Sequence, residues 1–138
     1  MPHLTIEYSA NLRDDGDWTS LCRKLASVLA SGEQGGKPVF PLGGIRVRAI
    51  AAEDWCIGDG SLADAAFVHA RLVIGAGRSE PVKRETGDAL FAVVREHFAG
   101  SFEARGLALS LEIGEFSDAG TWKHNNLHER YRAARRTG

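Results

Sequence analysis

The chain contains little of what marks membrane, secreted or disulfide-rich proteins. No apolar run among its 138 residues approaches the roughly 20 of a transmembrane helix. The N-terminus lacks the basic region and the apolar core of a signal peptide. The two cysteines, Cys22 and Cys56, form neither a CxxC motif nor a disulfide framework. These absences predict a protein of the reducing cytoplasm without a membrane partner.

Neither sign of charge dominates the sequence. The 17 Lys and Arg residues face 18 Asp and Glu residues, so the formal net charge is −1. This balance argues against nucleic acid as the main partner, and we interpret the cluster Arg130–Arg136 as the solvated face of a short basic helix. The histidines lack metal-ligand spacing, because His124 and His128 stand four apart without an HExxH motif. No metal is therefore expected.

Four segments alternate apolar with polar residues, which is the pattern of half-buried strands. They span residues 2–9, 45–51, 67–74 and 107–113. Apolar residues at helical spacing predict one helix that runs from Trp18 to a C′ residue at Gly32, and a second that follows Ser79 and ends at Gly100. Asp17 and Ser79 are the expected caps of these two helices.

The order strand–helix–strand therefore occurs twice. Each unit should pair its two strands in parallel through a right-handed crossover. Two units side by side predict an α/β (α+β) two-layer sandwich, in which a four-stranded mixed sheet carries both helices on one face. We take the chain as a single domain, 1–138, with pseudo-repeats at about 2–56 and 66–116 and a C-terminal tail at 120–138.

The other face of this sheet would carry a mixed set of polar side chains. They are Arg46, Arg48, His69, Arg71, Ser110 and Glu112. A sheet that contains parallel strands rarely leaves a face to water. We therefore expect partner subunits to bury this face.

Arg46 and Arg48 are candidates for binding a carboxylate. They stand two apart on one strand, so both project from the same face. They form either a guanidinium fork around a carboxylate or an ion pair, for instance with Glu7 or Glu112. The spacing alone leaves these two interpretations open.

The turn Gly75-Ala76-Gly77 begins like a GxGxxG dinucleotide motif, but Glu80 at the sixth position would repel a pyrophosphate. The turn instead delivers Arg78 and backbone N–H groups to a helix N-terminus, which favours a small anion such as a carboxylate. The alternative is a plain strand-to-helix turn with a solvated arginine.

Pro2 favours the functional interpretation of these arginines. Methionine aminopeptidase readily trims a methionine that precedes proline, and the new N-terminus would be a secondary amine at the end of a strand. An amine held in apolar surroundings near cations has a lowered pKa and can act as a base near pH 7. Such a base beside arginines suits proton transfer on a dicarboxylate.

The sequence resembles the 5-carboxymethyl-2-hydroxymuconate isomerase family. This family is a branch of the tautomerase superfamily, whose best-known members are 4-oxalocrotonate tautomerase and macrophage migration inhibitory factor. The resemblance runs in register from Pro2 to about His128. It is carried by Pro2-His3-Leu4-Thr5-Ile6-Glu7-Tyr8-Ser9, Phe40-Pro41-Leu42-Gly43-Gly44-Ile45-Arg46-Val47-Arg48, Ala66-Phe67-Val68-His69, Ile74-Gly75-Ala76-Gly77-Arg78-Ser79 and Lys123-His124-Asn125-Asn126-Leu127-His128.

The resemblance implies a tautomerase-like homotrimer that needs no cofactor and uses an amino-terminal proline as the base. Pro2 then matches the catalytic proline, and Arg46 and Arg78 match substrate-binding arginines, with Arg48 as a further candidate. The implied reaction converts 5-carboxymethyl-2-hydroxymuconate, a tricarboxylate enol, to 5-carboxymethyl-2-oxo-hex-3-ene-1,6-dioate in homoprotocatechuate degradation.

Two segments depart from the family pattern. The loop Gly32–Lys37, expected to be flexible, is longer, and the tail beyond Tyr131 is extended and basic. Two other functions stay open. The same proline can support dehalogenation or hydration of unsaturated acids, with Glu7 or Glu112 to activate water. Alternatively, the chain is a non-enzymatic trimeric ligand-binding or signalling protein.

Overall fold

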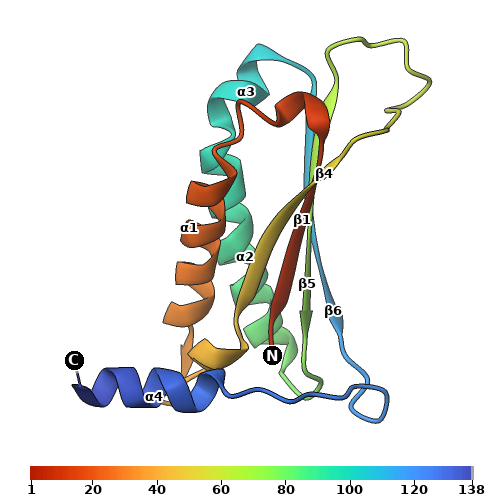
Figure 1. Cartoon of the computed structure of the whole chain (residues 1–138). Coiled ribbons are helices and arrows are strands. Elements are labelled where there is room, and N and C mark those ends of the chain that lie inside the picture. Colours follow the sequence, from red (N-terminus) through yellow and green to blue (C-terminus); the bar gives the residue numbers. More distant parts are fainter. Residues whose placement is uncertain (138) are drawn as a thin grey trace.

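A four-stranded sheet forms one layer of the molecule, and two long helices form the other (Figure 1). The computed structural model describes residues 1–137. The sheet contains β1 (His3–Ser9), β4 (Arg46–Ala52), β5 (Ala66–Ile74) and β6 (Leu107–Glu115), in the order β4-β1-β5-β6. β1 pairs with β4 in parallel and β5 with β6 in parallel, whereas β1 and β5 are antiparallel. The predicted mixed sheet of two strand–helix–strand units is confirmed.

The two helices that cover the sheet are α1 (Trp18–Ser31) and α2 (Glu80–His97). Shorter elements join them: the 3-10 turns η1 (Ala10–Leu12) and η2 (Leu42–Gly44), the strands β2 (Glu33–Gln34) and β3 (Lys37–Pro38), and the helices α3 (Ala99–Ala104) and α4 (Leu127–Thr137). The helix expected in the basic tail is α4, which lies across the end of the molecule where the N-terminus begins (Figure 1).

Apolar residues on one face of the sheet form the core with the helices. Leu4 and Ile6 of β1 are fully buried, as are Leu25 of α1 and Leu90 of α2. Strand side chains alternate between the two faces, so the period-2 pattern directs one set of residues toward the helices. This burial supplies the main driving force for folding, at about 25 cal/mol for each Å² of apolar surface removed from water.

The ends of the two long helices differ from the expectations in three places. Ser79 caps α2 as predicted, because its hydroxyl accepts a hydrogen bond from the Val82 N–H at 3.3 Å. Asp17 stands at the N-cap of α1 but makes no capping bond, since its backbone is left-handed. Gly32 ends α1 with an extended backbone and not as a left-handed C′ residue. Gly100 lies inside α3, because α2 already ends at His97.

The segment expected to be a flexible loop is a hairpin. Glu33 and Gln34 pair antiparallel with Lys37 and Pro38. The turn between them contains two glycines with φ of 60° and 77°, the left-handed conformation that a two-residue hairpin turn requires. A search for alternating apolar residues misses this hairpin because all four paired residues are exposed.

The face of the sheet away from the helices carries a polar network. His69 of β5 contacts Ser110 at 2.6 Å and Glu112 at 3.2 Å, both on β6, and Arg71 donates to the same carboxylate at 3.1 Å. Glu112 therefore pairs with Arg71 and His69, and not with the arginines of β4. Ile50, also on this face, is 49% exposed.

No helix among residues 1–137 is long and apolar enough to cross a membrane.

Candidate active site

Four parts of the chain meet at the end of the sheet where β1 begins. They are the N-terminus, the start of β4, the turn after β5 and the segment 116–125 that follows β6. They enclose a cavity of about 250 Å³. Its lining consists of Met1, His3, Arg46, Gly75, Phe116, Asp118, Thr121, Trp122, Lys123, His124 and Asn125. Three of these side chains, from Arg46, Lys123 and Asp118, bear a formal charge.

Pro2 lies buried at this end of the sheet. Its carbonyl accepts a hydrogen bond from the Arg46 N–H at 3.0 Å, which continues the parallel pairing of β1 with β4. Gly44 makes room for the N-terminus, because a Cβ there would lie 3.3 Å from the Met1 Cα and 3.5 Å from the Pro2 Cδ. The proline is thus held by the backbone of two neighbouring elements.

The N-terminal amine next to Pro2 lies in a cationic environment. Burial lowers the pKa of this amine below its ordinary value, and the charges of Arg78, Lys123 and Arg46 lower it further. Each of these effects disfavours the protonated amine, the first by removing water and the others by repulsion. An amine at this position is therefore neutral at a lower pH than a solvated one.

The structure brings Arg46 and Arg78 close enough to act on the same amine. Arg46 donates from Nη1 to the Gly44 carbonyl at 3.1 Å and contacts the Met1 Sδ at 3.8 Å. Arg78 donates to the carbonyls of Gly75 and Val39 at 3.2 Å and 2.9 Å. Backbone acceptors thus hold both guanidinium groups in place, and no carboxylate of the described chain lies within 4 Å of either.

Arg48 lies differently from the other two arginines. It is exposed on the open face of the sheet, and its Nη1 lies 3.3 Å from the Nδ1 of His3. It does not line the cavity, and it pairs with neither Glu7 nor Glu112. Arg46 contacts Gly44 and Met1, whereas Arg48 contacts His3, so the two guanidinium groups face different partners.

Sequence reasoning proposed only Arg46 among the side chains that line the cavity, and it missed His3, Phe116 and Lys123 among others. His3 and Phe116 meet edge to face, with ring centroids 5.6 Å apart, and Lys123 is near enough to affect the N-terminal amine. The position of His3 beside Pro2 on a strand could have indicated that it lies in the cavity. Phe116 and Lys123 lie in an irregular segment, where no periodicity reveals which residues approach the N-terminus.

Contacts with η2 fix the end of this irregular segment. Asn125 donates from Nδ2 to the Gly43 carbonyl at 3.0 Å, and its Oδ1 accepts from the Leu127 N–H at 2.7 Å. A Cβ on Gly43 would lie only 2.5 Å from the backbone nitrogen of His128. The close approach of α4 to η2 therefore requires glycine at position 43.

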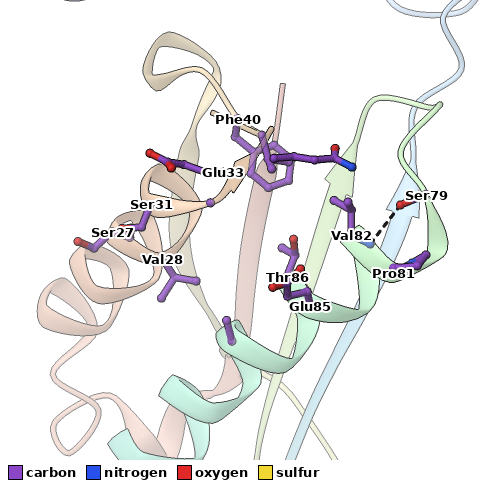
Figure 2. A pocket seen from close by; sticks show the side chains of 14 residues that line it. Ser27, Val28, Ser31, Glu33, Phe40, Ser79, Pro81, Val82, Glu85 and Thr86 are labelled. Carbon is purple, nitrogen blue, oxygen red and sulfur yellow. Dashed lines mark hydrogen bonds between the residues drawn. The ribbon is translucent and has the colours of Figure 1, made fainter. Parts of the chain in front are cut away.

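A larger hollow, of about 830 Å³, lies between α1 and α2 on the other side of the sheet. Figure 2 shows its lining, with Val28, Phe40, Val82 and the carboxylate of Glu85 among the labelled side chains. Its charged side chains are both carboxylates, from Glu33 and Glu85, and no Lys or Arg lines it. A polyanion would be repelled there, so the smaller cationic cavity suits an acidic ligand better.

Within the described part of the chain, no group of three or more His, Cys, Asp or Glu side chains could hold a metal ion. His124 lines the cavity, whereas His128 packs against Gly43.

Known proteins resemble the chain over most of its length. A family model described as 5-carboxymethyl-2-hydroxymuconate isomerase matches residues 2–131. The 5-carboxymethyl-2-hydroxymuconate Delta-isomerase of Escherichia coli is 41% identical over 128 residues, which are 93% of this chain and 97% of that protein.

Solved structures extend the comparison to the fold. A 5-carboxymethyl-2-hydroxymuconate isomerase from Deinococcus radiodurans R1 is 55% identical, with a TM-score of 0.87 over 95% of this chain and 94% of that one. A member of the cis-3-chloroacrylic acid dehalogenase family is 13% identical, with a TM-score of 0.62 over 95% and 90% of the two chains. The second likeness concerns the fold alone.

Proposed function

Because the chain belongs to the 5-carboxymethyl-2-hydroxymuconate isomerase family, we propose that it isomerises 5-carboxymethyl-2-hydroxymuconate by moving the proton of its 2-hydroxyl group to C5, with the Pro2 nitrogen as the base. The chain is an isomerase of this family. The observation that carries the mechanism is the place of the N-terminal amine beside the buried Pro2, among Arg78, Lys123 and Arg46. Burial and these three charges lower the pKa of the Met1 amine.

Removal of Met1 creates the base. With Met1 attached, the nitrogen of Pro2 is an amide and cannot accept a proton. Once Met1 is gone, that nitrogen becomes a secondary amine at the start of β1, next to the place of Met1 in the cavity lining. The cations that lower the pKa of the Met1 amine lie near it. Burial and positive charge lower the pKa of such an amine and so favour its neutral form, which is the state a general base needs.

The proton shift conserves all atoms and electrons of the substrate. Pro2 takes the proton of the 2-hydroxyl group, and the electron pair of that O–H bond forms the C2=O double bond. The C2=C3 pair moves to C3=C4, and the C4=C5 pair takes the proton back from Pro2 at C5. The reaction needs no cofactor, because the same proton returns to the same molecule.

Arg46 and Arg78 bind the carboxylates of the substrate. A guanidinium group matches a carboxylate through two parallel N–H donors, and each charged hydrogen bond contributes about 1.5–3 kcal/mol. Arg46 lines the cavity, and Arg78 acts on the amine from the turn after β5. Arg48, which lies outside the lining, contributes through its contact with His3.

We place this activity in a homotrimer that works in homoprotocatechuate degradation in the cytoplasm. The open face of the sheet supports the assembly, because it combines the network of His69, Arg71 and Glu112 with the exposed Ile50. A face of this kind is normally covered. Sedimentation equilibrium should give three times the mass of the chain.

Dehalogenation or hydration would have to use Asp118, the carboxylate of the cavity lining, and not Glu7 or Glu112. Those reactions require an acid that activates water beside the proline. Glu112 is held by His69 and Arg71, and Glu7 lies five residues from Pro2 along β1, about 16 Å at strand spacing. Neither carboxylate lines the cavity.

The decisive experiment compares proteins with a free and a blocked Pro2 nitrogen. A lysine inserted between Met1 and Pro2 prevents removal of the methionine and leaves Pro2 inside an amide. We expect this protein to lose about 10²–10⁴-fold in kcat on 5-carboxymethyl-2-hydroxymuconate in an ultraviolet assay, as for the loss of a positioned base. Pro2→Ala keeps a primary amine, so it should retain part of the activity.

Mass spectrometry of each protein establishes which N-terminus is present, and circular dichroism and sedimentation serve as controls for folding and assembly. A blocked protein that isomerises the substrate at the full rate would show that Pro2 is not the base. A free-amine protein that acts on a haloacrylate, and not on the hydroxymuconate, would favour the dehalogenase.

A further inference from the structure

His3 occupies a distinctive place in the cavity. It follows Pro2 directly, lines the cavity and is half-buried. Arg48 of the neighbouring strand contacts one side of its ring, and Phe116 meets the ring edge to face at 83°. In the proton shift at Pro2, this imidazole is neither the base nor a ligand of a substrate carboxylate.

The contact with Arg48 determines the tautomer of His3. A guanidinium group has donors only, so the Nδ1 of His3 must accept the hydrogen bond from the Arg48 Nη1. A neutral imidazole whose Nδ1 accepts carries its proton on Nε2. In the described part of the chain the ring makes no other hydrogen bond, so Nε2–H stays available in a residue that lines the cavity.

The charges around His3 keep the ring neutral. Burial lowers the pKa of His3, and the positive charges of Arg48, Arg46 and the N-terminal amine lower it further. Phe116, which packs on the ring from the end of β6, bears no charge. The charged groups that shift the pKa of His3 are all cationic, so they favour the neutral ring.

We propose that His3 binds the reacting oxygen of the substrate through its Nε2–H, and that Arg48 is the positioning residue that holds His3 in this tautomer. The proposal rests on the proton shift at Pro2 proposed above. In that shift the 2-hydroxyl oxygen loses its proton to the Pro2 nitrogen before C5 accepts it, so negative charge develops on this oxygen. A fixed donor aimed at an oxygen where charge develops stabilises the transition state.

A neutral donor also has an advantage over a cation at this place. An imidazolium next to Pro2 would repel the protonated amine that forms when Pro2 takes the proton. The neutral Nε2–H stabilises the oxygen without opposing the charge on the base, while Arg46 and Arg78 bind the carboxylates. His3 thus supplies the reacting oxygen with a donor distinct from the carboxylate-binding arginines.

The test replaces the ring by residues that keep or lose the Nε2–H. His3→Phe keeps an aromatic ring but has no donor, and we expect kcat to fall about 10²-fold with KM changed by less than about twofold. His3→Gln places an amide N–H near the position of Nε2 and should restore most of that loss. Thr5→Val, two residues along the same face of β1, is the matched control and should leave kcat unchanged.

The positioning role of Arg48 is tested by measuring which tautomer His3 adopts. In ¹⁵N spectra of the protein labelled at histidine, His3 should show an unprotonated Nδ1 and a protonated Nε2, its signals being identified by their absence in His3→Phe. Arg48→Met should lose this preference and reduce kcat, whereas Arg48→Lys, which retains a cationic donor, should keep both. A merely structural role of Arg48 would leave the tautomer of His3 unchanged.

The outcomes separate this inference from the proline mechanism. If the blocked-Pro2 protein is inactive and His3→Phe retains the full kcat, the inference fails and the mechanism stands. A rise in KM at constant kcat also contradicts the inference, because His3 would then bind a carboxylate in the ground state. If the blocked-Pro2 protein is fully active, the proline mechanism fails and the inference fails with it.

Discussion

The guanidinium carbon of Arg78 lies 4.7 Å from the centroid of the Phe40 ring. Arg78 follows β5, whereas Phe40 precedes η2 and is 2% exposed. The ring supports one side of the guanidinium group, and the carbonyls of Gly75 and Val39 accept from its two Nη atoms. The arginine is thus oriented before any substrate arrives.

This orientation predicts a loss of activity when Phe40 is changed. Phe40→Leu removes the ring, and a cation–π contact of this kind is worth about 0.5–2 kcal/mol, so kcat/KM should fall about 2- to 30-fold. Phe91→Leu on α2 is the matched control and should leave kcat/KM unchanged at a temperature where both proteins are folded. Equal kcat/KM in the two variants would mean that the ring does not orient Arg78.

Lys123 should set part of the pH dependence. Its positive charge lowers the pKa of the N-terminal amine, so Lys123→Met removes a repulsion that disfavours the protonated amine. The pKa of the amine then rises, and the ascending limb of kcat/KM against pH moves to higher pH. The profile is measured between pH 5 and 9, with Lys37→Met at the hairpin as the control. A limb that stays in place would show that Lys123 does not act on the base.

Gly43 should be needed for the docking of the C-terminal helix. Gly43→Ala brings a Cβ within 2.5 Å of the His128 backbone nitrogen, so α4 and η2 must move apart. Overpacking of this kind costs about 1–3 kcal/mol. Thermal unfolding and limited proteolysis should report a lower melting temperature and faster cleavage within the tail.

Gly100→Ala is the matched control for that experiment. A Cβ at Gly100 meets no atom within 4 Å, and the residue lies in α3, where alanine is the better helix former by up to about 1 kcal/mol. This variant should be as stable as the original chain or more stable. Equal resistance of both variants to proteolysis would contradict the close approach at Gly43.

Glu112 should make stability sensitive to acid. Hydrogen bonds from His69 and Arg71 lower the pKa of this carboxylate in the folded protein below its ordinary value of 4.5. The resulting stabilisation is fully present above that ordinary value and is lost as the pH falls through the lower pKa of the folded state. The melting temperature of Glu112→Gln should therefore lie below that of the original chain at pH 7. The difference should vanish in strong acid.

Glu103→Gln on α3 is the control for Glu112. Its melting curves should match those of the original chain across the same pH range. A difference between Glu112→Gln and the original chain that persists unchanged in acid would mean that the network does not depend on the charge of Glu112.

Local patterns were sufficient to predict most of the fold. The alternation of apolar residues in β1, β4, β5 and β6 predicts their position and the face they bury, because side chains alternate across a strand. The cap at Ser79 was also predicted locally, from the residue type at the start of α2. The hairpin at 33–38 was not, since its paired residues bury nothing and its order comes from backbone pairing around two glycines.

The site was only partly predictable. Pro2, Arg46 and Arg78 could be proposed from local spacing and a family resemblance, and the structure brings them to the same end of the sheet. The contact of Arg48 with His3 joins residues 45 positions apart. It depends on the register of β1 against β4, which no local pattern contains.

The sequence by itself determined the four long strands, the two long helices, the buried face of each strand and the family, because these depend on residue type and local spacing. Only the tertiary structure decided which cations surround the amine, which nitrogen of His3 is free and how the segment 116–125 closes the cavity. The physical reason is that charge repulsion, tautomer and cavity shape depend on distances between atoms. Strand pairing and the docking of α4 on η2 set those distances, and they act between residues far apart in the chain.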